Sequence, residues 1–574
     1  MVYELISPRT CSSSIEQVLY NRGIPLKDIP HYLNTTDEDI LSPLLLDNIE
    51  NAAKMLVRHI SAGSKVLVQV DSDVDGLTSS AVLINYLNEL FPSFVQNNIS
   101  YRLHDGKQHG IILDSIDSET KLVIAPDASS NDYEIHEELS KRGIDVLVLD
   151  HHEADKVSEY ACVVNNQLCD YPTKSLSGVG IVYKFCSYLD LLLGNNKARR
   201  FEDLVALGLI ADMVSLKDFE TRHLITIGLK KINNPFFKLM VEKQAFSLGE
   251  LITPIGIAFY IAPYMNAMCR SGTQEEKKLM FEAMLEFKSY ELLSSTKRGC
   301  KGQTETRVEQ ACRTCTNVKN RQTRSRDQST ETIEQLIEEQ NLLENKILVI
   351  KLDKKHAIDV NLTGLIANRL MAQYQRPVML LNEVEEDGKI YWRGSCRGYD
   401  KSALKDFRAF LEESGLTEWN HGHANAFGSS VANENFEALI KYSNEKLKDF
   451  DFTPKYNVDI IFDYNDIIPE DVMDIADYRR LWGQTVEEPF VVVENVPVYA
   501  DNLALMKGTT LKITTPAMEL IKFGSSDEEY ESLYSKLGCV IINVVGTCEI
   551  NSWNGRPQIK IEDYEIIKKQ QYYF

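Results

Sequence analysis

Apolar and polar positions alternate in blocks between residues 65 and 215. Short apolar runs, typical of buried strands, are separated by longer segments in which apolar residues recur with helical spacing. The predicted strands are 66–70, 122–126, 145–149 and 161–164, and the clearest helices between them are 78–90 and 132–142. This order is typical of β-α-β units, so we expect an α/β fold built on a parallel sheet.

The same patterns divide the chain into five regions. They are a helical segment at 1–62, the α/β region at 63–290, a helical connector at 291–345, a second α/β region at 346–450 and a strand-rich region at 451–574. In the connector, basic residues dominate as far as Arg326 and acidic residues follow from Glu331. A chain of 574 residues is long enough for several domains with separate cores.

Composition and charge exclude some classes of function. The apolar content of 44% and the charged content of 25% are those of a soluble globular protein. No apolar stretch has the length of a membrane span and the N-terminus has no secretory pattern, so we expect a cytoplasmic protein with no membrane partner. The net charge of −22 argues against general adhesion to nucleic acid, although it allows a local basic channel.

The eleven cysteines include one close pair, Cys312 and Cys315. This pair is weak evidence for zinc, because no second pair follows at ligand spacing. Reduced thiols are the expectation for a cytosolic protein.

Carboxylates and imidazoles follow three of the predicted strands. The residues at these three strand ends are Asp71, Asp73 and Asp75, then Asp127, then Asp150, His151 and His152. The carboxyl ends of parallel strands share one edge of a sheet, where ligands bind. Carboxylates brought together there repel one another unless cations separate them. The sequence therefore predicts a site for one or two divalent metals.

Further residues would complete such a site. Asp127 could bridge two ions, His151 or His152 would supply a nitrogen, and Asp212 follows a predicted buried helix at 204–212. Mg²⁺ and Mn²⁺ prefer carboxylate oxygen, and imidazole shifts the preference toward Mn²⁺. Two such ions suit in-line displacement at phosphorus.

Each motif also has an ordinary interpretation. The string from Asp71 to Gly76 could be a calcium loop or a solvated turn, but an EF-hand needs a Glu where this chain has Val82. Two adjacent histidines are more often a turn or a core pair than metal ligands. The coincidence of three such motifs at three strand ends favours the metal site.

At these residues the chain resembles the DHH phosphoesterases, and within them the RecJ single-strand exonucleases. The similar strings are Asp71 to Ser79, Asp127, Asp150 to His152, and Ala206 to Asp212. The string from Asp170 to Gly180 and the string from Ile261 to Arg270 are more specific to RecJ, with departures at Tyr264 and Cys269. In the second α/β region, His421 to Gly428 is similar to a glycine-rich family string, with departures at His421 and Phe427.

The resemblance implies a fold and a set of site residues. The fold is an α/β parallel-sheet DHH domain, a long helical connector, a second α/β DHH-associated domain and a C-terminal β-barrel of the oligonucleotide-binding (OB) type. The implied ligands of two Mn²⁺ or Mg²⁺ ions are Asp71, Asp73, Asp75, Asp127, His151 and Asp212, and the catalytic residues are Asp127, His151 and His152. His152 would be either a further ligand or a group that stabilises the phosphate or the leaving oxygen.

The resemblance also implies contacts with nucleic acid. The candidates are Arg102, Arg270, Arg369, Ser395, Arg397, Gly422, His423 and Trp553. Without the resemblance, Arg369, Arg376 and Arg397 would be interpreted as surface or interdomain salt bridges. Trp553 would either stack on a base or pack against its own hairpin.

Together these features predict a metal-dependent exonuclease for single-stranded DNA. The resemblance implies 5′→3′ direction, 5′-mononucleotide products and a role in DNA recombination, repair or replication. It also suggests a monomer that could work with a single-strand-binding protein or a helicase, and the departures suggest a phage- or prophage-encoded member. The alternatives are a DHH phosphodiesterase of short oligonucleotides or cyclic dinucleotides, and an inactive replication scaffold.

Overall fold

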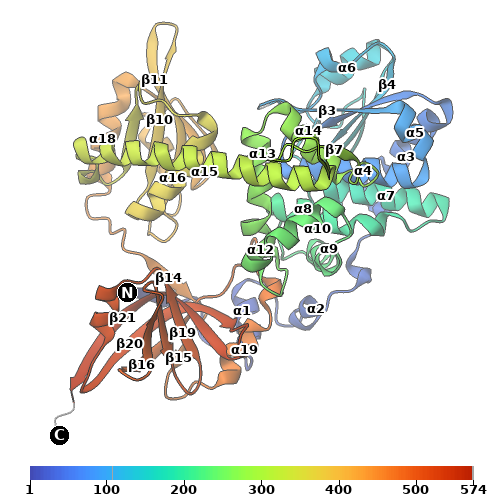
Figure 1. Ribbon diagram of the computed structural model, residues 1–574. Helices are drawn as coiled ribbons and strands as arrows, with labels where there is room; N and C mark the ends of the chain where they lie inside the picture. The colour runs from blue at the N-terminus through green and yellow to red at the C-terminus, as the bar shows by residue number, and fades with distance from the viewer. Residues whose placement is uncertain (107, 572–574) are drawn as a thin grey trace.

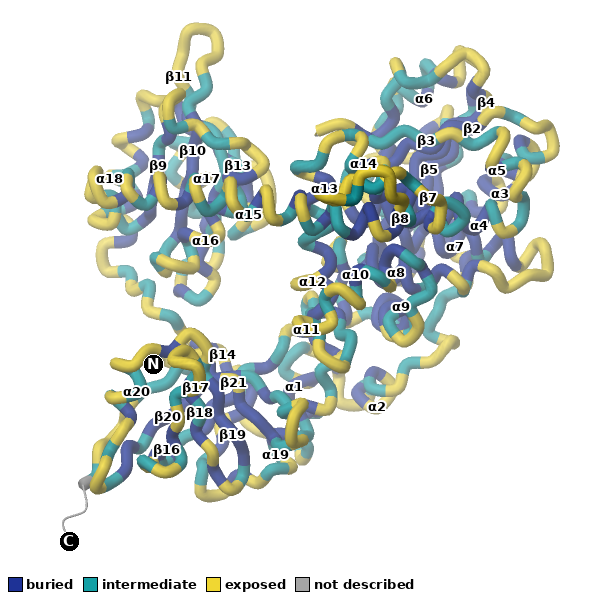
Figure 2. The backbone as a smooth tube through the Cα atoms, viewed as in Figure 1, coloured by how far each residue is buried: buried dark blue, intermediate teal, exposed yellow. Residues whose placement is uncertain are grey.

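The computed structural model describes residues 1–106 and 108–571 (Figure 1). Two α/β units are joined by one long helix, and a strand-rich unit lies below them in this view. Buried backbone is concentrated in the central strands and helices of the units (Figure 2). None of the helices in the described ranges is long and apolar enough to cross a membrane.

The first unit contains a parallel sheet, as the sequence predicted, but the sheet has a fifth strand, β3 (Ile99–Leu103), that the sequence did not predict. In spatial order its strands are β3, β2 (Lys65–Val70), β4 (Thr120–Pro126), β5 (Asp145–Asp150) and β6 (Cys162–Asn165). Alternate side chains enter two cores, because successive strand residues point to opposite faces. One core contains α6 (Tyr133–Lys141); the other contains α3 (Ile49–Ala62), α4 (Val74–Leu90) and α7 (Gly178–Leu193). All the strands therefore end at one edge.

Helices dominate the rest of the first unit. They are α5 (Pro92–Asn98), α8 (Glu202–Ala211), α9 (Phe219–Lys230), α10 (Pro235–Lys243), α11 (Ala245–Leu248), α12 (Pro254–Tyr260), α13 (Ala262–Ser271) and α14 (Gln274–Met284). Every residue from 203 to 210 in α8 is buried, so this helix forms the centre of the unit and fixes the position of Asp212 at its end.

The predicted connector is a short hairpin followed by a helix. Strands β7 (Leu292–Ser294) and β8 (Thr304–Thr306) precede α15 (Arg307–Glu339), which begins with a capping box between Thr306 and Glu309. Near its start, Cys312 and Cys315 are buried in the first core, whereas Ile333 and Ile337 are buried in the core of the second unit. One continuous helix is thus part of both cores.

The second unit has a mixed five-stranded sheet. Its strands in order are β12 (Trp419–His423), β13 (Ala426–Ala432), β11 (Lys389–Arg397), β10 (Val378–Glu386) and β9 (Leu348–Leu352), and its helices are α16 (Val360–Tyr374), α17 (Phe407–Ser414) and α18 (Phe436–Lys446). Only β9 and β10 are parallel. The α/β pattern predicted for 346–450 is therefore confirmed as secondary structure.

The strand-rich unit contains a mixed seven-stranded sheet. Its order is β15 (Ile460–Asp463), β16 (Val491–Tyr499), β20 (Gly538–Ile550), β21 (Pro557–Gln571), β19 (Glu519–Phe523), β18 (Thr510–Thr514) and β17 (Leu503–Met506), with α19 (Pro469–Ala476) and α20 (Asp527–Leu533) beside it. Within the described residues β15 and β17 do not pair with each other, so the expected closed OB-like barrel is not confirmed.

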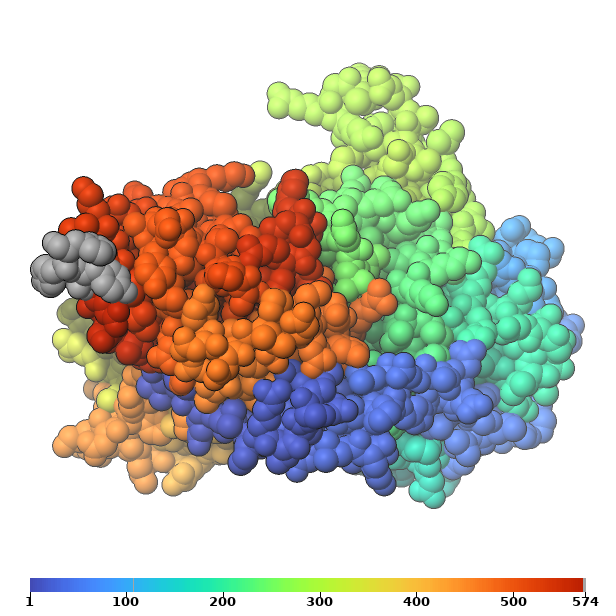
Figure 3. All heavy atoms as spheres, turned by 90° about the horizontal axis from the view of Figure 1, so that it is seen from below, coloured from blue at the N-terminus to red at the C-terminus, as the bar shows by residue number. Residues whose placement is uncertain are grey.

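The N-terminal segment is not wholly helical, which corrects the prediction for 1–62. Strand β1 (Val2–Leu5) pairs in parallel with β14 (Lys455–Val458) and precedes α1 (Ser14–Asn21) and α2 (Ile29–Leu33). The Arg22 guanidinium binds both oxygens of Asp459, at 2.7 and 2.9 Å. Figure 3 shows the N-terminal residues in blue along the orange and red C-terminal unit. This segment therefore ties the strand-rich unit to the first unit.

Candidate metal centre

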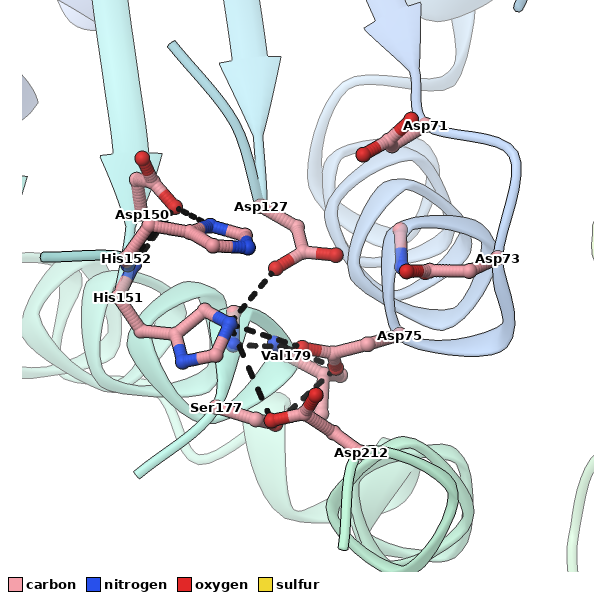
Figure 4. Close-up of polar contacts among 12 residues, drawn as sticks. Asp71, Asp73, Asp75, Asp127, Asp150, His151, His152, Ser177, Val179 and Asp212 are labelled. Carbon is pink, nitrogen blue, oxygen red and sulfur yellow. Dashed lines mark hydrogen bonds and ion pairs between the residues drawn. The ribbon is translucent and has the colours of Figure 1, made fainter. Parts of the chain in front are cut away.

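The predicted carboxylates and histidines meet at one edge of the first sheet (Figure 4). Strands β2, β4 and β5 deliver them at their carboxyl ends, and the start of α7 and the end of α8 complete the surroundings. The close approach of α7 depends on Gly178, because a Cβ atom there would lie 2.3 Å from Oδ1 of Asp127. Gly76 similarly leaves room for Asp71.

Asp75 is held by the first turn of α7. Its carboxylate accepts hydrogen bonds from Oγ of Ser177 at 3.0 Å and from the backbone N–H groups of Gly178 and Val179 at 2.7 and 3.0 Å. These N–H groups have no partner within their own helix, so they stabilise a carboxylate here. The string from Asp170 to Gly180 thus positions Asp75.

Asp127 is buried in a left-handed backbone conformation, with φ of 63°. Its Oδ1 makes no hydrogen bond within the described residues and lies 3.2 Å from Nε2 of His151. Burial, together with the charges of Asp75 and Asp73, raises the pKa of Asp127 well above its ordinary value. A buried carboxylate with a free oxygen and acidic neighbours is chemically suited to a cation.

His151 and Asp212 close the other side of the cluster. Nε2 of His151 lies 3.8 Å from Asp75 and 3.9 Å from Asp212. Burial lowers the pKa of His151, which favours the neutral imidazole that binds metals. Burial and the Asp75 charge raise the pKa of Asp212 to about 8.

Asp150 orients His152. Its Oδ1 accepts hydrogen bonds from Nδ1 of His152 at 2.7 Å and from the backbone of His151 at 2.7 Å, and its Oδ2 accepts from the backbone of Ser130. The hydrogen bond to Asp150 raises the pKa of His152 to about 9. The imidazole of His152 therefore carries a positive charge near neutral pH, with Nε2 as its second donor.

Asp71 and Asp73 occupy the third side. Asp73 caps α4 by accepting the Gly76 N–H at 2.8 Å, and it is exposed to solvent. Asp71 accepts hydrogen bonds from Nδ1 of His104 and Nδ1 of His109, at 2.8 and 2.5 Å. Burial opposes ionisation of Asp71, but these two hydrogen bonds hold its pKa below the ordinary value.

The potential ligand atoms form three overlapping groups within the described part of the chain. In each group the atoms lie within 4.8 Å of one another, and the groups are Asp71, Asp73 and Asp127; Asp75, His151 and Asp212; and Asp127, His151 and His152. All six predicted ligands and His152 are therefore brought together. Neither Cys312 nor Cys315 belongs to such a group, so the weak zinc alternative gains no support.

The predicted nucleic-acid contacts lie in several places. On the second unit, Arg397 donates to the Cys396 carbonyl at 2.7 Å, and burial together with the charge of nearby Arg270 lowers its pKa. Arg270 belongs to α13 of the first unit, so the positive charges of Arg270 and Arg397 influence each other across the two units. Ser395 shares a hydrogen bond with Thr363 at 2.8 Å.

The other candidates have different surroundings. Arg369 forms an ion pair with Asp327 at 2.7 Å, and Arg102 binds Gln108 through Nη2 while its Nη1 is buried without a partner in the described residues. Gly422, with φ of 134°, and His423 are exposed at the end of β12. Trp553 is 95% exposed, so the alternative in which it packs on its hairpin is wrong.

Many basic side chains of the connector form ion pairs with carboxylates, so its net positive charge is smaller than its sequence suggests. Arg307 pairs with Glu282 and Glu291, and the other paired cations are Lys297 and Arg313 with Glu305, Arg321 with Glu276, and Arg326 with Asp327. Arg376, whose role the sequence left open, donates to the carbonyls of Leu343 and Asn345. Neighbouring carboxylates therefore neutralise much of the positive charge of the connector.

Known proteins match both the sequence and the fold. Residues 65–209 match the family described as the DHH family, N-terminal domain. The chain is 38% identical over its full length to YorK of Bacillus subtilis (strain 168), provisionally named a SPbeta prophage-derived single-strand DNA-specific exonuclease, and covers 99% of that protein. It is 26% identical to the single-stranded-DNA-specific exonuclease RecJ of the same strain, over 97% of this chain and 68% of RecJ. The crystal structure of RecJ with Mn²⁺ from Thermus thermophilus shares the fold, with a TM-score of 0.69 at 20% identity, over 98% of this chain and 79% of that chain.

Proposed function

The chain belongs to the DHH family and, within it, to the RecJ-like exonucleases, and on this premise we propose that it is a metal-dependent exonuclease of single-stranded DNA. The full-length relative confirms the resemblance found in the motifs. The observation that carries the proposal is the convergence of Asp75, Asp127, His151 and Asp212 at the edge of the sheet.

Two divalent ions fit this cluster. An unsatisfied buried oxygen on Asp127 is costly without a cation, and the raised pKa values of Asp127 and Asp212 reflect repulsion that a cation would relieve. Carboxylates with one imidazole suit Mn²⁺ or Mg²⁺. The proposed ligands are those of the sequence-based prediction: Asp71, Asp73, Asp75, Asp127, His151 and Asp212. When bound, such ions would activate water and neutralise charge on the scissile phosphate.

The protein's own groups orient the reacting atoms. The first turn of α7 fixes Asp75, and the left-handed backbone of Asp127 directs its carboxylate between the acidic groups. His152 is held through Nδ1 by Asp150, so Nε2 can donate to the phosphate or to the leaving oxygen. Removal of His152 should therefore slow cleavage more than it weakens metal binding.

Cationic groups between the two α/β units support a path for the DNA backbone. Burial has the largest effect in lowering the pKa values of Lys319 and Arg397, and the positive charge of Arg270 lowers both pKa values further. Such a cluster favours a bound anion, and we assign phosphate contacts to Arg270 and Arg397. The remaining candidates for phosphate contact are Arg102, Ser395, Gly422 and His423. Arg369 could bind phosphate only after its ion pair with Asp327 is broken.

Aromatic side chains support a continuation of this path toward the strand-rich unit. A groove of about 890 Å³ between α11, α12 and this unit is lined by Trp553 and Phe246, which are 95% and 102% exposed. A smaller apolar pocket of about 310 Å³ is lined by Met213, which directly follows Asp212 in the chain. This pocket and the groove share the lining residues Ile255 and Glu488. Bases stack on exposed aromatic rings with little sequence preference. We assign base stacking to Trp553.

The direction of cleavage and the pathway rest on the family resemblance. On that basis we assign 5′→3′ cleavage to 5′-mononucleotides in DNA recombination, repair or replication. A phosphodiesterase of short oligonucleotides or cyclic dinucleotides would not need the long groove, and an inactive scaffold would not need the intact set of carboxylates.

Digestion of end-labelled oligonucleotides tests the proposal. Single- and double-stranded substrates with a 5′ or 3′ label are incubated with Mn²⁺, Mg²⁺ or EDTA. The proposal predicts immediate release of mononucleotide from the 5′ label, on single strands and only with metal. Cleavage confined to dinucleotides would favour the small-substrate alternative, and binding without cleavage would favour the scaffold.

The Asp127→Ala variant is the matched control. It should lose cleavage and retain most single-strand binding, because Asp127 is buried at the metal cluster and the strand contacts are assigned to Arg270, Arg397 and Trp553. Persistent cleavage by this variant would contradict the role of Asp127 as a bridging ligand.

A further inference from the structure

Two histidines outside the predicted motifs bind Asp71. Nδ1 of His104 lies 2.8 Å from Oδ1 of Asp71, and Nδ1 of His109 lies 2.5 Å from Oδ2. Both follow β3, which ends at the same edge of the sheet as β2. An ionised carboxylate only accepts hydrogen bonds, so each ring donates through Nδ1 and its Nε2 is directed away from Asp71.

The two histidines differ in exposure. The side chain of His104 is fully buried, whereas that of His109 is 53% exposed. The His109 ring lies 5.3 Å from the His152 ring, with an angle of 76° between their planes. The His152 ring lies 4.5 Å from that of His151. His109 therefore extends the row of imidazoles from the metal cluster toward solvent.

The pair of Asp71 and His109 has the same construction as the pair of Asp150 and His152. In each pair a carboxylate at the end of a strand accepts a hydrogen bond from Nδ1 of a partly exposed histidine, at 2.5 and 2.7 Å. The exposed fractions are also similar, 53% and 46%. The two pairs come from different strands and meet at the same place.

His109 is not placed as a metal ligand. None of the groups of potential ligand atoms found among the described residues includes it. Nε2 of His109 and Nε2 of His152 are each directed away from the carboxylate that holds Nδ1, and a DNA substrate brings phosphate oxygens to this edge of the sheet.

We propose that His109 and His152 together clamp a phosphate of the DNA strand, with one imidazole ring on each side of it and Nε2 of His109 as the atom that contacts a non-bridging oxygen. This assignment rests on the proposed function, because it takes single-stranded DNA as the substrate. His109 is then a substrate-binding residue, and His104 is a buried support for Asp71.

A mutant cycle with altered DNA tests the clamp. Binding of oligonucleotides is measured by fluorescence anisotropy in EDTA, using DNA that carries one uncharged methylphosphonate linkage, moved along the strand from its 5′ end. His109→Ala should weaken binding of unmodified DNA by about 10- to 100-fold, the usual range for a hydrogen bond to a charged group. At one position along the strand, the methylphosphonate should weaken DNA binding by the wild-type protein by a similar factor. At that position it should not change the DNA affinity of the His109→Ala variant.

The His104→Gln variant is the control, because His104 is buried and can influence DNA binding only through its hydrogen bond to Asp71. Mn²⁺ activation is titrated for wild type and for both variants, and thermal unfolding confirms that each is folded. The clamp predicts that His109→Ala raises KM even at saturating Mn²⁺, whereas His104→Gln does not. If both variants instead require more Mn²⁺ and KM at saturating metal is unchanged, His109 only supports Asp71 and the clamp is refuted.

A second variant guards against loss of folding. His109→Gln retains a donor toward Asp71 but lacks the imidazole ring, so it should show the same missing response at one linkage. If the methylphosphonate weakened DNA binding by the wild-type factor at every linkage in both variants, the clamp would be overturned. Cleavage by the wild-type protein would still leave the proposed function intact. A wild-type protein that neither binds nor cleaves single strands would overturn both.

Discussion

Substitution of Gly178 by alanine tests how closely α7 must approach the metal cluster. Gly178 is the first residue of α7, and its N–H donates to Asp75 at 2.7 Å. A Cβ atom at this position would lie 2.3 Å from Oδ1 and 2.6 Å from Cγ of Asp127, whereas ordinary contacts begin at 3.4 Å. Gly178 does not have a positive φ, so the cost comes from contact with Asp127 and not from the backbone.

The magnitude follows from the displacement. Either Asp127 or α7 must move by about 1 Å to restore an ordinary contact. The helix resists this movement, because Ser177, Gly178 and Val179 all donate to Asp75. A misplacement of about 1 Å in a reacting group costs on the order of 100-fold in rate. Overpacking of this kind also costs about 1–3 kcal/mol of folding free energy.

Gly180→Ala is the matched control. It lies two residues further along the same helix, and the three atoms nearest to its Cβ would all belong to Leu176, the first at 2.4 Å. The assay is the initial rate of nucleotide release from single-stranded DNA as a function of Mn²⁺ concentration, with thermal unfolding of each variant. Gly178→Ala should lose about 100-fold in kcat and require more Mn²⁺, while Gly180→Ala loses stability only. Equal rates for the two variants would refute the reasoning.

Three further predictions concern the pH response, the DNA backbone and the bases. Burial and the Asp75 charge raise the pKa of Asp212 to about 8, so folding of the metal-free protein loses stability as pH rises from about 4 to about 8. In EDTA, Asp212→Asn should therefore gain Tm relative to wild type over this range; parallel Tm curves would contradict the prediction. Arg397→Ala should weaken single-strand binding and reduce the salt dependence of the binding constant by about one phosphate contact, whereas an unchanged salt slope would remove Arg397 from the path. Trp553→Ala should weaken binding of long single strands by about 1–3 kcal/mol and leave dinucleotide cleavage unchanged, as measured by anisotropy and by product release.

The sequence predicted the metal cluster because its signals are local. Each carboxylate follows a continuous apolar run, and such runs are typical of central strands in a parallel sheet. The carboxyl ends of these strands necessarily meet, so Asp71, Asp127 and His151 could be placed together from the chain alone. Asp212 follows a buried helix, α8, and not a strand, so this rule does not place it, and its assignment rested on the family resemblance.

The same logic missed His104 and His109 because they follow an edge strand. Strand β3 is only partly buried, and its sequence from Ile99 to Leu103 includes Ser, Tyr and Arg. It therefore lacks the apolar run that marks the central strands, and the loop after it could not be assigned to the sheet edge. The partial exposure of this one strand is sufficient to explain the omission.

Long-range pairing limited the other predictions. Strand β1 pairs with β14, more than 400 residues away, and no local pattern encodes that contact. Charge along the connector was visible, but its partners were not: Glu282 and Glu291, which pair with Arg307, come from neighbouring segments brought together by folding. A basic stretch in sequence is a basic surface only where such partners are absent.

The string from Asp170 to Gly180 shows what a family-specific motif contributes beyond ligands. None of its residues belongs to the potential ligand groups found in the described chain. Its end nevertheless forms the first turn of α7, where Ser177 and two backbone N–H groups hold Asp75 and where Gly178 makes room for Asp127. Carboxylates alone would repel one another and separate, so their geometry depends on such supports. The centre therefore requires Gly178 of α7 as well as the acidic residues, which is why the Gly178 variant is its most direct test.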